Sequence, residues 1–418
     1  MKKVLFILIG LSLCYLHTVA QHLTIDECQS KAHANYPLIK RYELIDKTEG
    51  FNLSNAGKGY LPQVSLSAKA TYQSQVTEIP ISVPGVEGMS KDQYSATLDV
   101  TQTIWDGGVI SGKKDLTKAS SLSEQKQLDV DLYEINDRVN QMFFGILLLD
   151  AKLKQNQLLQ DELQRNYNQV SSYIENGVAN QSDLDAVKVE QLKSIQAQTQ
   201  LKSNRKAYLD MLSSLIGTPL NENVMLQKPD GDILLHSFVN KRPELDLFDA
   251  QYKNLEVQKK LIKANYMPKL GLFVTGGYSR PGLNMLENKF SAYYIGGVRL
   301  TWNFGSLYTQ KNERRIIEAN QQSLDVQKET FLFNTNLQSI QGVTEVMKNR
   351  DLLKYDDEII TLRNNVKKAA EMKVANGTLT VTDLMREVTN EDMAKQDKIQ
   401  HETELLLSIY NLKYTTNN

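Results

Sequence analysis

The sequence predicts an α+β membrane protein in which long α-helical hairpins are joined to β-strands of membrane-spanning length, with an internal two-fold sequence repeat. Three observations predict this fold class. Matched motifs recur about 200 residues apart, four segments alternate between apolar and polar residues, and two long stretches without proline favour helices with apolar heptads. Each half of the chain is therefore expected to run as a helix, two strands, a very long helix, a turn and a return helix.

Residues 1–20 have the pattern of a secretory signal peptide. A basic start at Lys2 and Lys3 is followed by a short apolar run over 4–13, and small residues precede the expected cleavage after Ala20. The apolar run is too short to span a bilayer as a helix, so export is expected.

Composition excludes several functional classes. Loss of residues 1–20 removes two lysines and no acidic residue, which changes the formal charge from −1 to (48 − 2) − 49 = −3. No basic stripe predicts nucleic-acid binding. Cys28 is the one cysteine left, so no intrachain disulfide is expected, and lipid attachment at Cys14 is disfavoured by the bulky Leu13 before it. The histidines are few and scattered, so we expect no metal, no cofactor and no enzyme.

Four segments alternate between apolar and polar residues, as strands with two different faces do. In the first, Val64, Leu66 and Ala68 alternate with polar residues. Pro62 and Pro268 each follow a Tyr-x pair, end a preceding helix and begin a strand. The strands are expected at about 62–76 and 92–105 in the first half, and at about 268–280 and 290–303 in the second. Their lengths suit tilted membrane-spanning strands.

The apolar strand faces allow two interpretations: a sheet packed on a protein core and a sheet in contact with lipid. The rest of the chain is almost all long helix, with no obvious second layer, which favours lipid. Four strands cannot close a barrel alone, and open sheet edges are not tolerated in lipid. Several chains are therefore expected to donate strands to one barrel.

A tryptophan with a glycine two or three residues after it marks the end of each strand pair. The tryptophans suit an aromatic girdle at a membrane interface, and the glycines suit a sharp transition from strand to helix. Residues 107–113 also fit the phosphate-binding pattern G-x-x-x-x-G-K, but Lys114 stands where Ser or Thr would hold magnesium, so nucleotide binding is not expected. The expected junction residues are Pro62, Trp105, Gly107, Gly108, Pro268, Trp302 and Gly305.

Long helices are expected over 110–176 and 307–375, and return helices over 182–216 and 381–414. Heptads that include Ile135, Met142 and Leu149 predict coiled-coil packing. Gly177 and Gly377 signal helix ends, so each long helix is expected to form an antiparallel hairpin with its return helix. The expected N-caps of the return helices are Ser182 and Thr382.

The return helices are polar at mid-length, where apolar residues would be expected. One interpretation is a helix face on a water-filled lumen, and the other is a solvated face of a helical bundle, because periodicity alone does not separate the two. The residues concerned are Gln191, Ser194 and Gln198 in the first return helix, and Glu391, Lys395 and Lys398 in the second.

The order of elements and these motifs resemble the TolC-like outer-membrane efflux proteins, also called outer-membrane factors. The resemblance covers essentially the whole mature chain. It divides the chain into a signal peptide (1–20), a first TolC-like repeat (21–217), a linker (218–234) and a second TolC-like repeat (235–418).

The resemblance implies a homotrimer in the cell outer membrane. Three chains would give 3 × 4 = 12 strands in one β-barrel surrounded by lipid, continued into the periplasm by an α-helical barrel. The hairpin turns would meet a periplasmic adaptor (membrane fusion protein) and an inner-membrane pump. The implied function is a passive exit duct for small-molecule efflux or type I protein secretion, with the cargo chosen by the pump.

Rings of carboxylates often constrict the periplasmic tip in this family, and the matching residues here are Asp183 and Asp383. The family's further acid falls at Arg386, so Asp383 and Arg386 are expected to form a salt-bridged closure. Helix capping is the alternative role of the two acids, because an Asp in the first turn favours a helix N-terminus. The tip and gate candidates are Gly177, Ser182, Asp183, Gly377, Thr382, Asp383 and Arg386.

Two alternative functions remain. A periplasmic coiled-coil adaptor also has long helical hairpins, but normally one hairpin and no strands of membrane length. A structural helical protein, such as an adhesin or a filament subunit, would form no closed barrel and conduct no ions.

Overall fold

The computed structural model describes residues 22–77, 88–231 and 239–417. The predicted signal peptide lies outside the described residues, as do parts of the first strand-to-strand loop and of the predicted linker. The chain forms two compact units, which we call the hairpin unit (Met1–Ile39, Asp129–Pro243, Phe331–Asn418) and the strand unit (Lys40–Leu128, Glu244–Thr330). Each unit therefore combines segments from both halves of the sequence.

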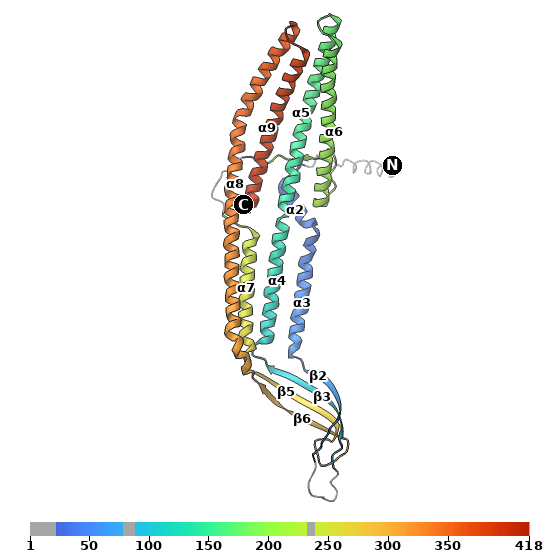
Figure 1. The fold of residues 1–418 in the computed structure, drawn as a ribbon, viewed down its shortest axis with the longest axis vertical. Coiled ribbons are helices and arrows are strands. Elements are labelled where there is room, and N and C mark those ends of the chain that lie inside the picture. The colour runs from blue at the N-terminus through green and yellow to red at the C-terminus, as the bar shows by residue number, and fades with distance from the viewer. Residues whose placement is uncertain (1–21, 78–87, 232–238, 418) are drawn as a thin grey trace, which may run out of the picture. The chain divides into compact units, whose positions relative to one another are not determined.

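The same order of elements occurs in each half of the chain (Figure 1). The strand unit contains α3 (Arg41–Gly57), β2 (Gln63–Tyr72), β3 (Asp92–Trp105), most of α4 (Val109–Tyr133), nearly all of α7 (Pro243–Asn265), β5 (Lys269–Arg280), β6 (Ser291–Thr301) and the first part of α8 (Leu307–Ala375). The hairpin unit contains β1 (His22–Leu23), α2 (Ile25–Asn35), α5 (Ile135–Glu175), α6 (Gln181–Ile216), β4 (Met225–Leu226), the rest of α8 and α9 (Val381–Thr416). Short 3₁₀ turns are η1 (Pro37–Lys40), η2 (Lys58–Tyr60) and η3 (Phe304–Ser306).

Two elements differ from the expected bounds. The single helix expected over 110–176 is divided at Glu134, where ψ is −19° and the backbone hydrogen bond to Val130 is stretched to 3.4 Å. Such a shallow ψ is closer to a 3₁₀ than to an α-helical value, which interrupts the regular ladder. The first strand ends at Tyr72, earlier than the predicted 76, because the chain bends at Ser74 and Gln75.

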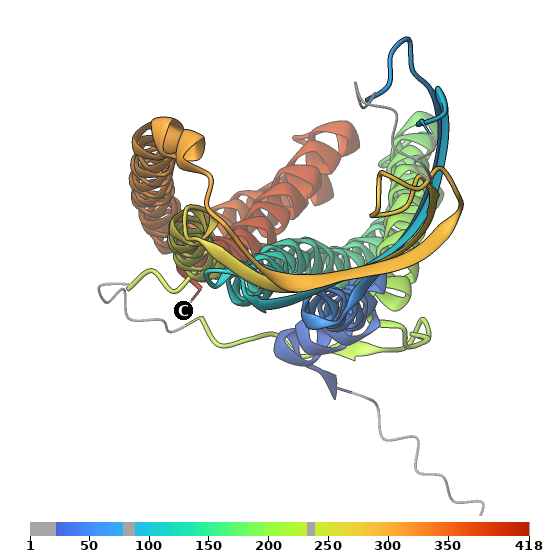
Figure 2. The same cartoon turned by 90° about the horizontal axis from the view of Figure 1, so that it is seen from below.

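The four longer strands form one antiparallel sheet in the order β2-β3-β5-β6 (Figure 2). Its register places Leu66, Leu98, Gly276 and Tyr294 in one row across the sheet. Residues of the same parity share a face of a strand, so the alternating apolar residues gather on one face of the whole sheet. Strands β2 and β6 form its two edges, and neither has a further partner strand within the described residues.

The apolar face of this sheet is exposed in the single chain. Leu66 is 77% exposed and Tyr294 is 82% exposed, and Val64, Val298 and Leu300 are exposed as well. An apolar patch of this kind marks a surface that contacts a lipid or a partner. In an ordinary sheet of a globular protein, by contrast, the apolar face is buried against a core.

The hairpin unit is built from helices that pack through apolar residues. Helix α5 packs against both α6 and α9, and the expected heptad residues Ile135 and Leu149 are buried in this packing. A larger apolar cluster, here called the tip cluster, is formed by Leu163, Val170, Val187, Ala370, Val374, Val381, Leu384, Met385 and Val388. Among the described residues, none of the helices is long and apolar enough to cross a membrane.

Candidate functional site

Both hairpin turns end their long helices in the same way. Gly177 and Gly377 have φ of +72° and +71°, the left-handed region in which a side chain is strained. Each glycine N–H donates to the carbonyl three residues earlier, Ile174 at 3.0 Å and Val374 at 2.9 Å. The residue after each glycine donates to the carbonyl five residues earlier, which completes a Schellman motif.

The N-caps of the return helices are not the residues that the sequence suggested. Asn180 and Thr380 are the N-caps, whereas Ser182 and Thr382 lie two residues later, inside the first turns of α6 and α9. The Asn180 side chain accepts from the backbone N–H groups of Ser182 at 2.9 Å and Asp183 at 3.3 Å. The spacing Asn180-x-x-Asp183 is a capping box, and this signal in the sequence identifies the cap.

Asp183 and Asp383 occupy equivalent capping positions. The Asp183 carboxylate accepts from the Asn180 backbone N–H at 3.1 Å, and the Asp383 carboxylate accepts from the Thr380 hydroxyl at 2.7 Å. Arg386 lies 3.2 Å from Asp383, but both residues belong to α9 and Arg386 is largely exposed. The pair therefore forms within one helix in this chain rather than across the turns.

Residues next to both turns share one apolar cluster. The tip cluster takes residues from all four helices of the two hairpins, and Ala179 and Leu379 of the two turns pack against it. Figure 1 shows both turns at the same end of the hairpin unit. The structure thus places both turns, which lie about 200 residues apart in the sequence, against one apolar cluster.

Three of the six polar residues at the middle of the return helices are buried, which corrects both interpretations of the sequence at these three positions. Gln191, Ser194 and Glu391 are buried between helices rather than facing a lumen or bulk solvent. Ser194 donates to the Gln191 carbonyl at 2.7 Å, and its own carbonyl accepts from Asn156 of α5 at 3.2 Å. Polar partners on neighbouring helices make this burial tolerable.

A cluster of charged side chains lies at the centre of this polar layer, and we call it the ion cluster. Glu391 is 1% exposed and lies 2.6 Å from Lys367 Nζ and 2.8 Å from Lys395 Nζ. Asn364 donates to the Glu391 carboxylate at 2.9 Å. Lys367 also pairs with Glu162, which joins α8 to both α5 and α9.

The ion cluster shifts the ionisation of its members. Burial acts to raise the pKa of Glu391, but hydrogen bonds from Asn364, Lys367 and Lys395 outweigh it and lower that pKa to about 2. Burial acts to lower the pKa of Lys367, yet its two carboxylate partners raise it. Burial raises the pKa of the adjacent Asp392, although Gln155 donates to its carboxylate at 2.9 Å.

The first strand-to-helix junction is built on a buried aspartate and two left-handed glycines. Asp106 accepts from the backbone N–H groups of Gly108 at 2.9 Å and Ile110 at 2.6 Å, which stabilises the start of α4. Gly107 has φ of +73°, and a Cβ there would lie 2.4 Å from Cβ of Met267. This geometry requires glycine for a sharp turn, and Trp105 ends the preceding strand.

The second junction achieves the same transition differently. Asn303 accepts from the Gly305 N–H at 3.1 Å, and a 3₁₀ turn leads into α8. The Trp302 indole donates to the Tyr266 carbonyl at 3.1 Å. Pro62 and Pro268 each lie directly before a strand.

Metal-binding types of side chain and one cysteine occur in the part of the chain that the structure describes. Its His, Cys, Asp and Glu side chains form no group of three or more that could hold a metal ion. Cys28 is buried and unpaired with another cysteine, and burial raises its pKa to about 12. A thiol of such high pKa is a poor nucleophile at neutral pH.

Comparison with known proteins identifies similar chains over nearly the whole length. The family model described as Outer membrane efflux protein matches residues 31–218. Outer membrane protein TolC of Salmonella enteritidis is 22% identical over 444 aligned residues, covering 99% of this chain and 86% of TolC. The Escherichia coli (strain K12) TolC is also 22% identical, with the same coverage.

Solved structures share the fold. The outer membrane protein VceC from Vibrio cholerae superposes with a TM-score of 0.67 at 12% identity, covering 94% of this chain and 96% of VceC. The outer-membrane channel OprN gives a TM-score of 0.68 at 14% identity, covering 94% of this chain and 89% of OprN. The likeness confirms the expected combination of long helical hairpins with a four-stranded sheet.

Proposed function

Because this chain belongs to the TolC-like outer-membrane efflux protein family, we propose that it is the outer-membrane exit channel of a tripartite export system. It resides in the cell outer membrane, with its helices extending into the periplasm. Energy for transport comes from an inner-membrane pump, and a periplasmic adaptor connects the pump to the hairpin turns. The channel itself is a passive duct for small molecules or proteins.

The observation that carries this proposal is the open four-stranded sheet with an exposed apolar face. Within lipid every backbone N–H and C=O must be paired, so the edges of β2 and β6 require partner strands. Edge pairing between β6 of one chain and β2 of the next satisfies both edges at once. Three chains then give 3 × 4 = 12 strands in a closed barrel.

The helical hairpins supply the periplasmic part of the duct. Both turns are held by Schellman motifs and side-chain N-caps, with a capping box at the first, and both turns pack on the tip cluster. Rigid turns at one end of the unit suit a docking surface for an adaptor, since a preorganised surface loses little conformational entropy on binding.

We also propose that Asp183 and Asp383 gate the tip in addition to capping the helices. If they do, Asp183→Ala combined with Asp383→Ala raises single-channel conductance, because two carboxylates per chain leave the constriction. Asp185→Ala, an exposed acid two residues from Asp183 on α6, is the matched control. Unchanged conductance with lower thermal stability leaves capping as the only role of the two acids.

Membrane fractionation followed by unheated gel electrophoresis and negative-stain imaging tests the exit-channel function. A detergent-extracted trimer with a long tapered stalk is expected. A soluble monomer rules out the shared barrel and favours the periplasmic adaptor. A membrane-free filament would favour the structural helical protein.

A further inference from the structure

The polar face of the four-stranded sheet carries an excess of cations. The strands contain six charged residues, of which Asp92 and Arg280 form an ion pair where β3 begins and β5 ends. The other four are Lys69, Asp99, Lys269 and Arg299. All four have odd residue numbers. The register places the odd-numbered residues on the face opposite the apolar one. The polar face therefore has a formal charge of 3 − 1 = +2 per chain.

Asp99, the one acidic strand residue on this face, already accepts hydrogen bonds from neighbouring side chains. Asp99 accepts hydrogen bonds from the Thr275 and Thr97 hydroxyls, 2.5 Å and 3.4 Å away. No carboxylate of the described residues forms an ion pair with Lys69, Lys269 or Arg299. Their positive charges are thus available to a solute on the polar face.

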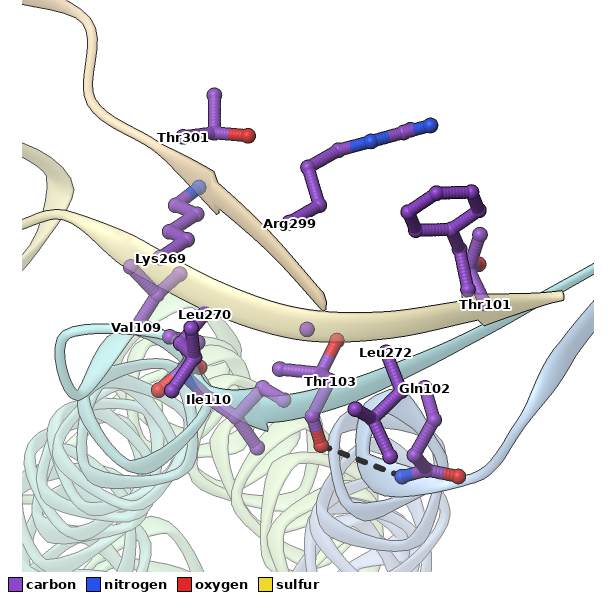
Figure 3. Close-up of a pocket in the computed structure, with 13 residues that line it drawn as sticks. Thr101, Gln102, Thr103, Val109, Ile110, Lys269, Leu270, Leu272, Arg299 and Thr301 are labelled. Atoms are coloured by element: carbon purple, nitrogen blue, oxygen red, sulfur yellow. Dashed lines mark hydrogen bonds between the residues drawn. The ribbon is translucent and has the colours of Figure 1, made fainter. Parts of the chain in front are cut away.

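Two of the cations lie close together at the end of the sheet that joins the helices. In the register Lys269 is opposite Thr301, and Arg299 is opposite Gly271. Figure 3 shows Lys269, Arg299 and Thr301 on the same side of β5 and β6, whereas Leu272 points to the other side. Gly271 lies between Arg299 and Thr103 in this row, and it has no side chain to separate them.

The surroundings of this pair suit an anion. The Arg299 guanidinium lies over the Phe273 ring at 4.6 Å from its centroid, an arrangement that holds the group in place while its N–H edge stays available. Thr101, Thr103 and Thr301 line the same hollow and add hydroxyl groups. The hollow also includes the Asp106 carboxylate, which accepts hydrogen bonds from the backbone N–H groups of Gly108 and Ile110. Arginine, lysine and hydroxyl groups together are the usual partners of carboxylate, sulfate and phosphate.

We propose that the barrel is anion-selective, so that solutes with carboxylate, sulfate or phosphate groups pass its wall more readily than cations do. This inference rests on the proposed exit channel, in which the polar face lines the lumen. Three chains then place a formal charge of 3 × 2 = +6 on the lumen wall. Rings of like charge set the ion preference of a pore because they concentrate counter-ions within it.

The test is the reversal potential of the purified trimer in a planar bilayer under a potassium chloride gradient. Low salt is used, because the Debye length is about 10 Å at 0.1 M and shorter in concentrated salt. The proposed tip carboxylates would themselves favour potassium, so every measurement uses a reference channel that carries Asp183→Ala and Asp383→Ala. This reference channel is expected to give a chloride-to-potassium permeability ratio above unity. Lys269→Gln combined with Arg299→Gln reduces the formal charge of the polar face to zero per chain, and the ratio should fall by about two-fold or more.

A charge-conserving variant separates charge from side-chain shape. Lys269→Arg combined with Arg299→Lys keeps both charges and should retain the ratio of the reference channel. A conducting channel that prefers potassium, or a ratio unchanged in the glutamine variant, overturns anion selectivity and leaves the exit channel intact. A reference channel that carries no current, although its proposed gate residues are removed, overturns the exit channel, and anion selectivity with it.

Discussion

Lys367 of α8 and Glu391 of α9 are joined by a 2.6 Å ion pair, and the glutamate is 1% exposed. The same lysine pairs with Glu162 of α5, and the same glutamate pairs with Lys395 at 2.8 Å. The second hairpin is thereby tied to the first by charge as well as by the tip cluster. Loss of one partner in such a pair is costly, because the other charge stays buried.

Lys367→Met is expected to destabilise the hairpin unit by about 3–5 kcal/mol, since Glu391 and Glu162 then share a site without their common cation. Thermal unfolding of the detergent-extracted protein, followed by circular dichroism, measures this loss. Lys354→Met is the matched control on α8, because Lys354 is exposed and pairs with an exposed Asp351. Equal unfolding temperatures for the two variants would show that the ion cluster contributes nothing to stability.

Asp392→Asn is expected to stabilise the protein at pH 7 and to lose this advantage in acid. Burial raises the pKa of Asp392 in the folded protein. Above this raised pKa the carboxylate is ionised and buried, which lowers the stability of the fold. Below the ordinary value of 3.8 the carboxyl group is protonated in both the folded and the unfolded protein, so this cost disappears. Unfolding temperatures at pH 7 and pH 3 test this sign. Asp397→Asn, an exposed position on the same helix, should show no such pH-dependent gain. A destabilising effect at pH 7 would contradict the prediction.

The ion cluster is the part of the site that sequence analysis missed. The pattern of Glu391 and Lys395 in a helix indicates a solvated or lumenal face, because carboxylates are rarely buried without a partner. The partner, Lys367, lies on α8, on the other side of the hairpin turn from Glu391. Only the packing of α5, α8 and α9 brings the two side chains together. Periodicity describes one helix at a time, so it does not reveal a partner on another helix.

The strands and turns were more accessible to sequence analysis. Side chains along a strand alternate between its two faces, so Leu98 and Thr97 are assigned to opposite faces without knowledge of the tertiary structure. The glycines at 177 and 377 were also predictable, because a left-handed helix end favours glycine. The N-caps were placed two residues late, although the spacing Thr380-x-x-Asp383 carried the signal.

Gly177→Ala is expected to cost about 1–2 kcal/mol, because its φ is +72° and nothing lies within 4 Å of an added Cβ. The cost is therefore purely conformational, and Gly377→Ala should show the same. Gly50→Ala in the interior of α3 is the matched control, since that glycine also has open space but no positive φ. It should stabilise the protein by about 0.5–1 kcal/mol. If Gly177→Ala and Gly50→Ala change the unfolding temperature in the same direction, this assignment is contradicted.

Leu98→Arg and Thr97→Arg place the same cation on opposite faces of one strand. Leu98 lies in the apolar row between Leu66 and Gly276, so an arginine there would face lipid at a cost of about 2–4 kcal/mol per chain near mid-bilayer. Thr97 lies on the polar face, where an arginine stays hydrated. Leu98→Arg should therefore leave little trimer in the outer-membrane fraction on unheated gels, whereas Thr97→Arg should assemble as the wild type does. Normal assembly of Leu98→Arg would mean that this face of the sheet does not contact lipid, and the shared barrel would lose its main support.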